Sequence, residues 1–368
     1  MAADKTGEKP DGTPIEGVTV GRVRLAGNLV LAPMCGVTDL ATRRVTRREG
    51  AALCFTEMLS SVALLHDSKK TFDLLRTAAE DAPLAVQVFG GDPDVLAKAC
   101  TLLESKGVQW IDLNMGCPVP KVANHEAGSG LLKDLVLIGR IFAAMRKAIG
   151  GTFTCKIRAG WDMESLVFTE VVRIAGEEGL DAIAFHPRTR AQQYTGKANW
   201  NFLKAAKEIS RIPVFGSGDL FTPADVIRMQ RETGVDGCYL ARGAQGNPWI
   251  FRRALAGLAG KPDPGRPSVA GLRAVMLEHL DGSCSLYGEN RGVRMFRKHI
   301  GWYTKGLRNS AQLRAQAFGF LEAAAVQATL NAYFDTLEAS GLNPWAGEPE
   351  ASAGNPPETP EDCLAYAG

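Results

Sequence analysis

The sequence lacks the features that mark membrane, secreted and zinc-binding proteins. No apolar run approaches the 18 residues of a membrane-spanning helix, and the first ten residues contain no apolar stretch of the kind found in signal peptides. The eight cysteines form no CxxC pair and are scattered along the chain. This spread is typical of a reduced cytosolic protein and predicts neither a disulfide scaffold nor a metal site. We therefore expect a cytoplasmic protein that crosses no membrane.

A large excess of charge is also missing. The formal net charge is +2, with 22% charged and 45% apolar residues. So small a charge excludes a wholly basic protein that coats nucleic acid, although it leaves room for a local basic face. The apolar share is ordinary for a soluble protein with a sizeable core. Nothing in the sequence indicates an obligate protein partner.

The 368 residues divide by composition into five segments. Residues 1–17 and 341–368 are rich in Gly, Pro and polar residues, which predicts a disordered leader and tail. Residues 18–258 carry alternating strand and helix signals, and residues 259–267 form a linker rich in Pro and Gly. Residues 268–340 show helical patterns without a strand signal, which predicts a small all-α domain.

Eight short β-prone runs alternate with helix-like segments in the larger domain. They are residues 28–34, 51–57, 84–89, 110–114, 153–158, 181–186, 212–216 and 236–241. Two of the helices have clear starts, at Asp92-Pro93 and at Thr222-Pro223. The alternation predicts an α/β fold, a (β/α)8 TIM barrel, which typically needs about 250 residues. A doubly wound open sheet is the alternative, but no GxGxxG follows the first strand.

The fourth run leads into an unusual loop, with Asn114 at its end and then Gly116, Cys117 and Pro118. A buried cysteine before a turn is the ordinary interpretation of such a fragment. In a TIM barrel, however, the active site lies at the carboxyl ends of the strands. Cys117 is therefore a candidate active-site thiol.

The loops after the seventh and eighth runs resemble a phosphate site. Residues 216–219 and 241–246 are rich in small residues and include Arg242, and they occupy the usual phosphate-binding place of such barrels. A phosphorylated cofactor there would explain Lys156, a cation at a strand end, and Gln87, an amide able to bind a heterocycle edge. His186 fits either a cofactor contact or a buried core histidine.

Motifs spread over residues 18–340 resemble the tRNA-dihydrouridine synthases, most nearly the bacterial members. They are LAPMCGVTD at 31–39, EM at 57–58, QV at 87–88, DLNMGCP at 112–118, GSGLL at 128–132, KIRAGW at 156–161, HPRTR at 186–190, GD at 218–219 and ARGAQGNPWIF at 241–251. The resemblance implies an FMN-binding barrel that uses NADPH to reduce a uridine in tRNA.

The resemblance also implies site residues. The family's flavin contacts fall on Pro33, Met34, Cys35, Gln87, Lys156, Ser217, Gly218, Asp219, Ala241 and Arg242, and its catalytic cysteine falls on Cys117. Three positions depart from the family pattern. Ser217 stands where Asn is expected, and Ala241 and Pro187 stand where Gly is expected. A backbone contact to the flavin tolerates Ser or Ala, whereas a side-chain contact from the missing Asn would be lost.

Reduction of the uracil double bond needs a hydride at carbon 6 and a proton at carbon 5. FMN would supply the hydride. A cysteine thiol has an ordinary pKa near 8.5 and is mostly protonated at neutral pH, so Cys117 is expected to donate the proton. Asn114, Lys156 and Arg158 are candidates to polarise the uracil carbonyls.

A uridine inside folded RNA must be turned outward, which calls for a surface that holds RNA. Residues 290–309 contain six basic and no acidic residues, and Arg291, Arg294 and Lys298 share one helical face. We expect this face, with Arg297, to contact tRNA phosphates, and Arg188 and Arg190 at the barrel rim to join it. A solvated helix face is the alternative.

Two other functions remain open from the sequence. One is a flavin barrel that acts on a free pyrimidine, for which the basic helical part would have no purpose. The other is a tRNA-binding module without catalysis, which would bind no flavin.

Overall fold

The computed structural model describes residues 17–66, 68–123, 126–341, 343 and 345. The predicted disordered leader and tail, and Cys363, therefore lie almost entirely outside the described residues.

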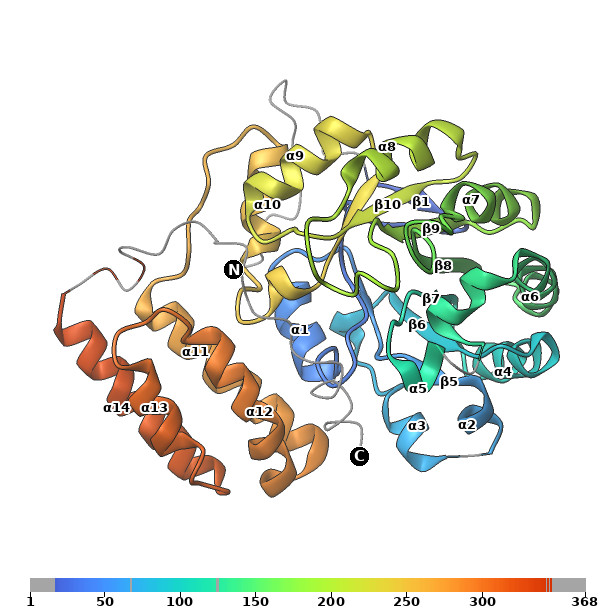
Figure 1. The fold of residues 1–368 in the computed structure, drawn as a ribbon. Helices are drawn as coiled ribbons and strands as arrows, with labels where there is room; N and C mark the ends of the chain where they lie inside the picture. Colours follow the sequence, from blue (N-terminus) through green and yellow to red (C-terminus); the bar gives the residue numbers. More distant parts are fainter. Residues whose placement is uncertain (1–16, 67, 124–125, 342, 344, 346–368) are drawn as a thin grey trace.

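Eight parallel strands close into a barrel (Figure 1). They are β3 (Leu29–Leu31), β4 (Leu53–Phe55), β6 (Leu84–Phe89), β7 (Trp110–Met115), β8 (Thr152–Arg158), β9 (Ala182–His186), β10 (Val214–Ser217) and β11 (Gly237–Leu240). The barrel closes because β4 pairs with both β3 and β6. Each of the eight predicted runs overlaps one of these strands, so the predicted TIM barrel is confirmed.

Two small β elements flank the barrel. A hairpin of β1 (Thr19–Val20) and β2 (Val23–Arg24) precedes it, and β5 (Leu59–Ser60) pairs with β6.

Helices surround the barrel, and the two predicted helix starts, at Asp92-Pro93 and Thr222-Pro223, are confirmed. The longer ones are α1 (Leu40–Arg48), α4 (Pro93–Ser105), α6 (Leu135–Ala148), α7 (Phe168–Glu177), α8 (Trp200–Ile209), α9 (Pro223–Thr233) and α10 (Ile250–Leu258). Shorter helices are α2 (Ser61–Leu65), α3 (Lys69–Asp73) and α5 (Pro120–Ala123), with 3-10 turns at Ala79–Asp81, Gly128–Lys133 and Arg242–Ala244. The Asp92 side chain accepts from the backbone of Val95 at the start of α4, and Thr222 and Asp225 form a reciprocal cap on α9.

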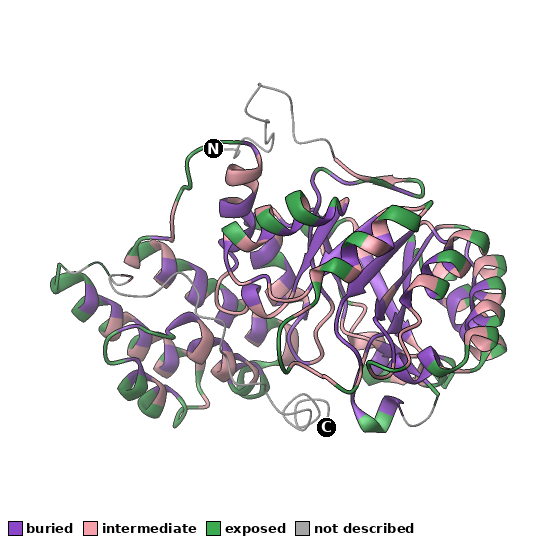
Figure 2. Cartoon of the chain, turned by 45° about the horizontal axis from the view of Figure 1, so that its top comes forward, coloured by how far each residue is buried: buried purple, intermediate pink, exposed green. Residues whose placement is uncertain are grey.

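The inside of the barrel is divided into an apolar and a polar level. Phe55, Trp110, Phe215 and Tyr239 pack together on the axis and are almost fully buried. Side chains two residues further along a strand point the same way. Asp112 and Asn114 therefore follow Trp110 on the inner face of β7, nearer the carboxyl ends. Figure 2 shows the buried strands inside a shell of helices with exposed outer faces.

Four helices follow the barrel: α11 (Val269–Tyr287), α12 (Glu289–Tyr303), α13 (Ser310–Ala317) and α14 (Ala323–Ala339). They share a hydrophobic core and pack beside α1 (Figure 1). Described residues after 268 contain no strand, which agrees with the predicted all-α part. Contacts to the barrel include Thr42 Oγ1 to His279 Nε2 (3.3 Å), and Lys298 Nζ donating to the Gly36 carbonyl.

Among the helices that the structure describes, none combines the length and apolarity that crossing a bilayer requires.

A buried ion pair ties α1 to the segment before β6. The Arg43 and Asp81 side chains are 1% and 0% exposed, and Arg43 Nη2 lies 2.9 Å from Asp81 Oδ2. The same guanidinium donates to the carbonyls of Thr38 (2.8 Å) and Arg76 (2.7 Å). Arg76 in turn donates to the Leu286 carbonyl of α11 at 2.7 Å, so the pair supports the contact between the barrel and the helices.

Asp81→Asn should lower the free energy of unfolding by about 3–5 kcal/mol, because it leaves the buried Arg43 cation without its counter-charge. Glu80→Gln is the matched control. Its pair with Arg44 is about half exposed on both sides and should contribute only about 0–1 kcal/mol. Urea unfolding followed by circular dichroism measures both variants. Equal losses would contradict the assignment of Arg43–Asp81 as the stabilising pair.

Candidate active site

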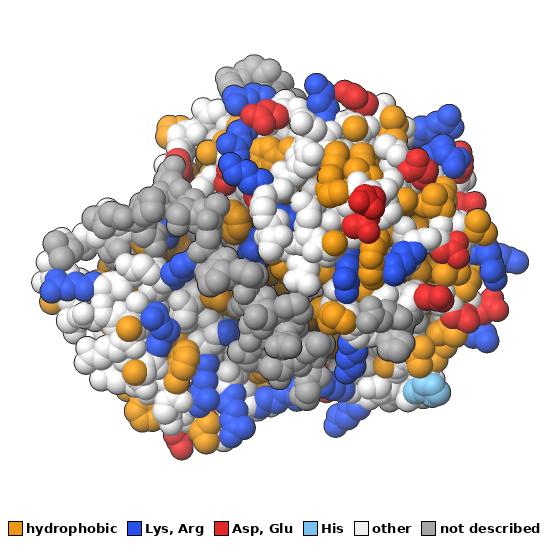
Figure 3. Space-filling view, in the orientation of Figure 1, with side chains coloured by type: hydrophobic (Ala, Val, Ile, Leu, Met, Phe, Trp, Pro, Cys, Tyr) orange, Lys and Arg blue, Asp and Glu red, His pale blue; other side chains and the backbone are white. Residues whose placement is uncertain are grey.

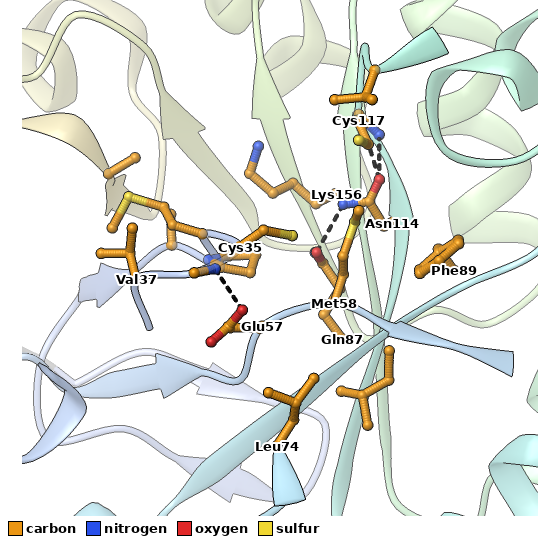
Figure 4. Close-up of a pocket in the computed structure, with 18 of the residues that line it drawn as sticks. Cys35, Val37, Glu57, Met58, Leu74, Gln87, Phe89, Asn114, Cys117 and Lys156 are labelled. Carbon is orange, nitrogen blue, oxygen red and sulfur yellow. Dashed lines mark hydrogen bonds between the residues drawn. The ribbon is translucent and has the colours of Figure 1, made fainter. Parts of the chain in front are cut away.

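A cavity of about 1270 Å³ lies where the carboxyl ends of the strands face the helical part of the chain. Its outer wall includes Leu286, Tyr287, Arg291, Met295 and Trp302 from α11 and α12. Figure 4 shows barrel side chains that point into this space. The place is the one where TIM barrels carry their active sites.

Most of the predicted site residues line this cavity. The predicted cofactor contacts among them are Pro33, Met34, Cys35, Gln87, Lys156, His186, Ser217, Gly218, Asp219, Ala241 and Arg242. Asn114, Cys117, Arg158 and Arg291 line it as well. The fold thus gathers residues that are far apart in the sequence, while the role of each stays a prediction.

A chain of hydrogen bonds runs along the inside of the barrel to Cys117. Gln87 Nε2 donates to Asp112 Oδ2 (2.7 Å), and Asn114 Nδ2 donates to Gln87 Oε1 (2.8 Å). Asn114 Oδ1 accepts from the backbone N–H groups of Cys117 (2.9 Å) and Gly116 (3.2 Å). The link between Gln87 and Asn114 and the link to Cys117 are drawn in Figure 4. The strand register causes this order, because Gln87 on β6 pairs with Asp112 on β7.

The Cys117 loop is also held from its other side. The Cys117 carbonyl accepts from Ser129 Oγ (2.8 Å) and from the Ser129 N–H (3.2 Å). Gly128 adopts a φ of 56°, and a Cβ there would lie 3.2 Å from the Cys117 Cβ, so glycine is favoured for two reasons. Burial raises the pKa of the Cys117 thiol, against the opposing effect of Arg158 and Lys156. The thiol is therefore protonated at neutral pH.

Four basic side chains, Lys156, Arg158, Arg188 and Arg242, surround His186. Burial lowers the pKa of His186 well below its usual range, and these cations lower it further. The imidazole is therefore neutral at physiological pH. Burial lowers the pKa of Lys156 to about 8, so most of its ammonium is still charged at neutral pH.

Two carboxylates stand against these four cations. Asp219 accepts from Arg188 Nη2 at 2.8 Å and lies 3.8 Å from Arg242 Nη2. Asp112 interacts with Lys156, whose pKa its charge raises. The cations outnumber the acids, so this end of the cavity is positively charged and suits an anionic ligand.

A glycine, Gly218, lies beside this charge and lines the cavity. Gly218 adopts a φ of 105°, and a Cβ there would lie 2.9 Å from His186 Cδ2, so a side chain is excluded. A glycine-containing loop next to an arginine is an arrangement found at phosphate sites. No cluster of His, Cys, Asp or Glu suited to a metal ion occurs in the described part of the chain.

The structure corrects the expectation that Arg188 belongs to an exposed RNA-binding surface. Arg188 is only 1% exposed, and its guanidinium donates to Asp219 and to the carbonyls of Thr195 (3.2 Å) and Gly196 (2.6 Å). These bonds occupy the side chain inside the protein, where it holds the Asp219 loop. Arg190 lies outside the cavity and stacks on the Trp161 ring at 4.4 Å.

The predicted basic face of α12 divides into two groups. Arg291 is exposed and lines the cavity, whereas Arg294 is exposed on the same helix away from it. Arg297 and Lys298 are half-buried and donate to the carbonyls of Phe320 and Gly36.

Two aromatic residues of the predicted RNA-binding stretch, Phe296 and Tyr303, are buried in the helical core and cannot contact RNA.

Several cavity residues were not found from the sequence. The Tyr194 ring lies 4.8 Å from the Arg242 guanidinium and 5.4 Å from that of Arg158. It stands in an irregular loop whose pattern carries no signal. Tyr287 and Met295 reach the cavity only because the helical part packs against the barrel mouth. Their only sequence signal was their closeness to the basic stretch.

Comparison with known proteins identifies the family that this chain matches. The dihydrouridine synthase family model matches residues 30–338. The tRNA-dihydrouridine synthase B of Pseudomonas aeruginosa is 40% identical over 325 residues, which cover 88% of this chain and 98% of the relative. A probable tRNA-dihydrouridine synthase of Rickettsia bellii is 38% identical over 298 residues, which cover 81% and 91%.

A solved structure shares the fold at low identity. Histamine dehydrogenase from Rhizobium sp. 4-9 superposes with a TM-score of 0.51 at 14% identity, over 73% of this chain and 50% of that chain. At this identity the likeness concerns the fold alone.

Proposed function

The chain belongs to the dihydrouridine synthase family, and from that premise we propose that it reduces specific uridines of tRNA to 5,6-dihydrouridine. The observation that best supports this reaction is the cavity that joins a protonated thiol, Cys117, to a positively charged pocket at the strand ends.

The proposed cofactor is FMN, and its phosphate fits the pocket made by Gly218, Asp219 and Arg242. The local excess of cations supports this placement. Lys156 and Gln87 would hold the ring system, since both line the cavity. When bound, FMN supplies the hydride that reduces carbon 6 of uracil. NADPH as the reductant of the flavin is proposed on the family resemblance.

Cys117 is the proposed proton donor to carbon 5. Burial keeps its thiol protonated. The bond that its N–H donates to Asn114 and the bond that its carbonyl accepts from Ser129 fix the backbone on both sides of it. A general acid needs a transferable proton and a fixed direction. Both are present at this position.

Negative charge that develops on the uracil carbonyl needs donors. Lys156 supplies an ammonium whose nitrogen has no hydrogen-bond or ion-pair partner among the described residues. Arg158 is partly occupied, because it donates to the carbonyls of Gly116 (2.8 Å) and Thr189 (2.9 Å). We therefore assign the polarising role to Lys156 and Asn114, with Arg158 holding the loop that carries Cys117.

RNA rather than a free pyrimidine is the proposed substrate because the helical part shapes the entrance. Figure 3 shows Lys and Arg side chains along the lower edge of this part of the molecule. Arg291 brings one such cation to the cavity itself. Phosphates that flank a turned-out nucleotide would meet positive charge there.

The proposed setting is a reducing, cytosolic one. None of the seven described cysteines forms a disulfide, which supports it.

Cys117→Ala should slow the reoxidation of reduced flavin by tRNA in a single turnover by about 100- to 10,000-fold, because the proton donor is lost. Reduction of the flavin by NADPH should stay unchanged. Cys284→Ala, which removes a half-exposed thiol from α11, is the control. Dihydrouridine formed by Cys117→Ala at the wild-type rate would rule out Cys117 as the acid.

Arg291→Ala and Arg294→Ala test the contact with tRNA. Both should weaken tRNA binding and lower the slope of log affinity against log salt by about one unit each, since each removes one phosphate contact. Only Arg291→Ala should also slow reoxidation at saturating tRNA, because only Arg291 reaches the cavity. Unchanged salt slopes in both variants would mean that this helix face is merely solvated.

A further inference from the structure

The proposed reaction gives no role to Asp112, a buried acid on β7. Asp112 is 0% exposed, and its carboxylate has no ion pair among the described residues. Its two oxygens accept from Thr154 Oγ1 (2.6 Å) and Gln87 Nε2 (2.7 Å). A buried carboxylate with no cation in contact is costly, so its presence here requires a reason.

An ionised carboxylate accepts hydrogen bonds and cannot donate them. Gln87 must therefore turn its NH2 group toward Asp112 and its carbonyl oxygen toward Asn114. This orientation obliges Asn114 to turn its own NH2 group toward Gln87, as observed at 2.8 Å. One negative charge thus sets the direction of both amides.

The orientation of the Asn114 amide decides which hydrogen bond it can still make with a ligand. Its Oδ1 already accepts from the N–H groups of Gly116 and Cys117, which occupy both lone pairs. Its Nδ2 donates one hydrogen to Gln87 and retains a second. Asn114 lines the cavity, so the only bond it can still make there is as a donor.

We propose that Asp112 is a positioning residue that, through Gln87, makes Asn114 a donor toward the substrate and anchors the Cys117 loop. The part of this inference that concerns the pyrimidine rests on the proposed function. A donor is what a uracil carbonyl needs as negative charge develops on it. The anchoring of the loop is a property of the protein alone.

Without the negative charge of Asp112, the amides of Gln87 and Asn114 no longer have a fixed orientation. An asparagine at position 112 carries both a donor and an acceptor, so Gln87 can bind it in either orientation. In the reversed orientation, Asn114 Nδ2 faces the N–H groups of Gly116 and Cys117. Donors would then meet donors, and the loop would lose both bonds.

The test compares Asp112→Asn, which keeps the shape and removes the charge, with Asp112→Glu, which keeps the charge and changes the shape. The first measurement is amide hydrogen exchange of the peptide that contains Gly116 and Cys117, in the full-length protein. Asp112→Asn should exchange about tenfold faster than wild type, the change expected for a lost hydrogen bond, with Asp112→Glu between them.

The second measurement is reoxidation of reduced flavin by saturating tRNA. Asp112→Asn should be slower than wild type by roughly 100-fold, as when one donor to a developing oxyanion is removed, and Asp112→Glu should recover part of the rate. The affinity for tRNA should change less than about threefold, because it does not depend on this donor.

Asp181→Asn controls for general destabilisation, because Asp181 accepts from Arg146 and Phe153 at the opposite end of the barrel. Three results would overturn the proposal. They are wild-type exchange in Asp112→Asn, an Asn variant that exchanges no faster and reoxidises flavin no more slowly than the Glu variant, or the same losses in Asp181→Asn. If wild type forms no dihydrouridine, the proposed function fails instead, and the exchange measurement still decides the role of Asp112.

Discussion

The buried carboxylate of Asp112 sets the orientation of the polar side chains at the centre of this barrel. Below it on β7, Trp110 belongs to the aromatic plug that fills the barrel axis, and above it Asn114 opens onto the cavity. Asp112 therefore stands at the boundary between the packed core and the polar site. Its hydrogen bonds to Gln87 and Thr154 connect three neighbouring strands at one level.

This placement has a thermodynamic consequence. Burial raises the pKa of Asp112 to about 6, against the lowering effects of its hydrogen bonds and of Lys156. Because the folded pKa lies above the ordinary value near 3.8, the residue contributes most to stability when protonated. That contribution is lost as pH rises through about 6, so at neutral pH the ionised carboxylate weakens the fold. The same ionised form is the one that directs the two amides.

The barrel could be predicted from the sequence, but the hydrogen bonds inside it could not. Eight strand runs, the helix starts at Asp92 and Thr222 and the place of Cys117 follow from local patterns. The chain from Asp112 to Cys117 depends on the register between β6 and β7, which sequence periodicity does not fix. Arg188 was misassigned because a short basic motif gives no sign of burial. Tyr287 and Met295 were missed because only the packing of the helices against the barrel brings them to the cavity.

The central claim is that an ionised Asp112 orients Gln87 and Asn114, and neutron diffraction from crystals in deuterated solvent at neutral pH tests it directly. X-ray data seldom reveal hydrogens, whereas neutron maps place deuterium and so distinguish an amide nitrogen from its oxygen. We expect no deuterium on the Asp112 carboxylate, deuterium on Gln87 Nε2 directed at Asp112, and deuterium on Asn114 Nδ2 directed at Gln87. Deuterium on Asp112, or either amide in the reverse orientation, would contradict it.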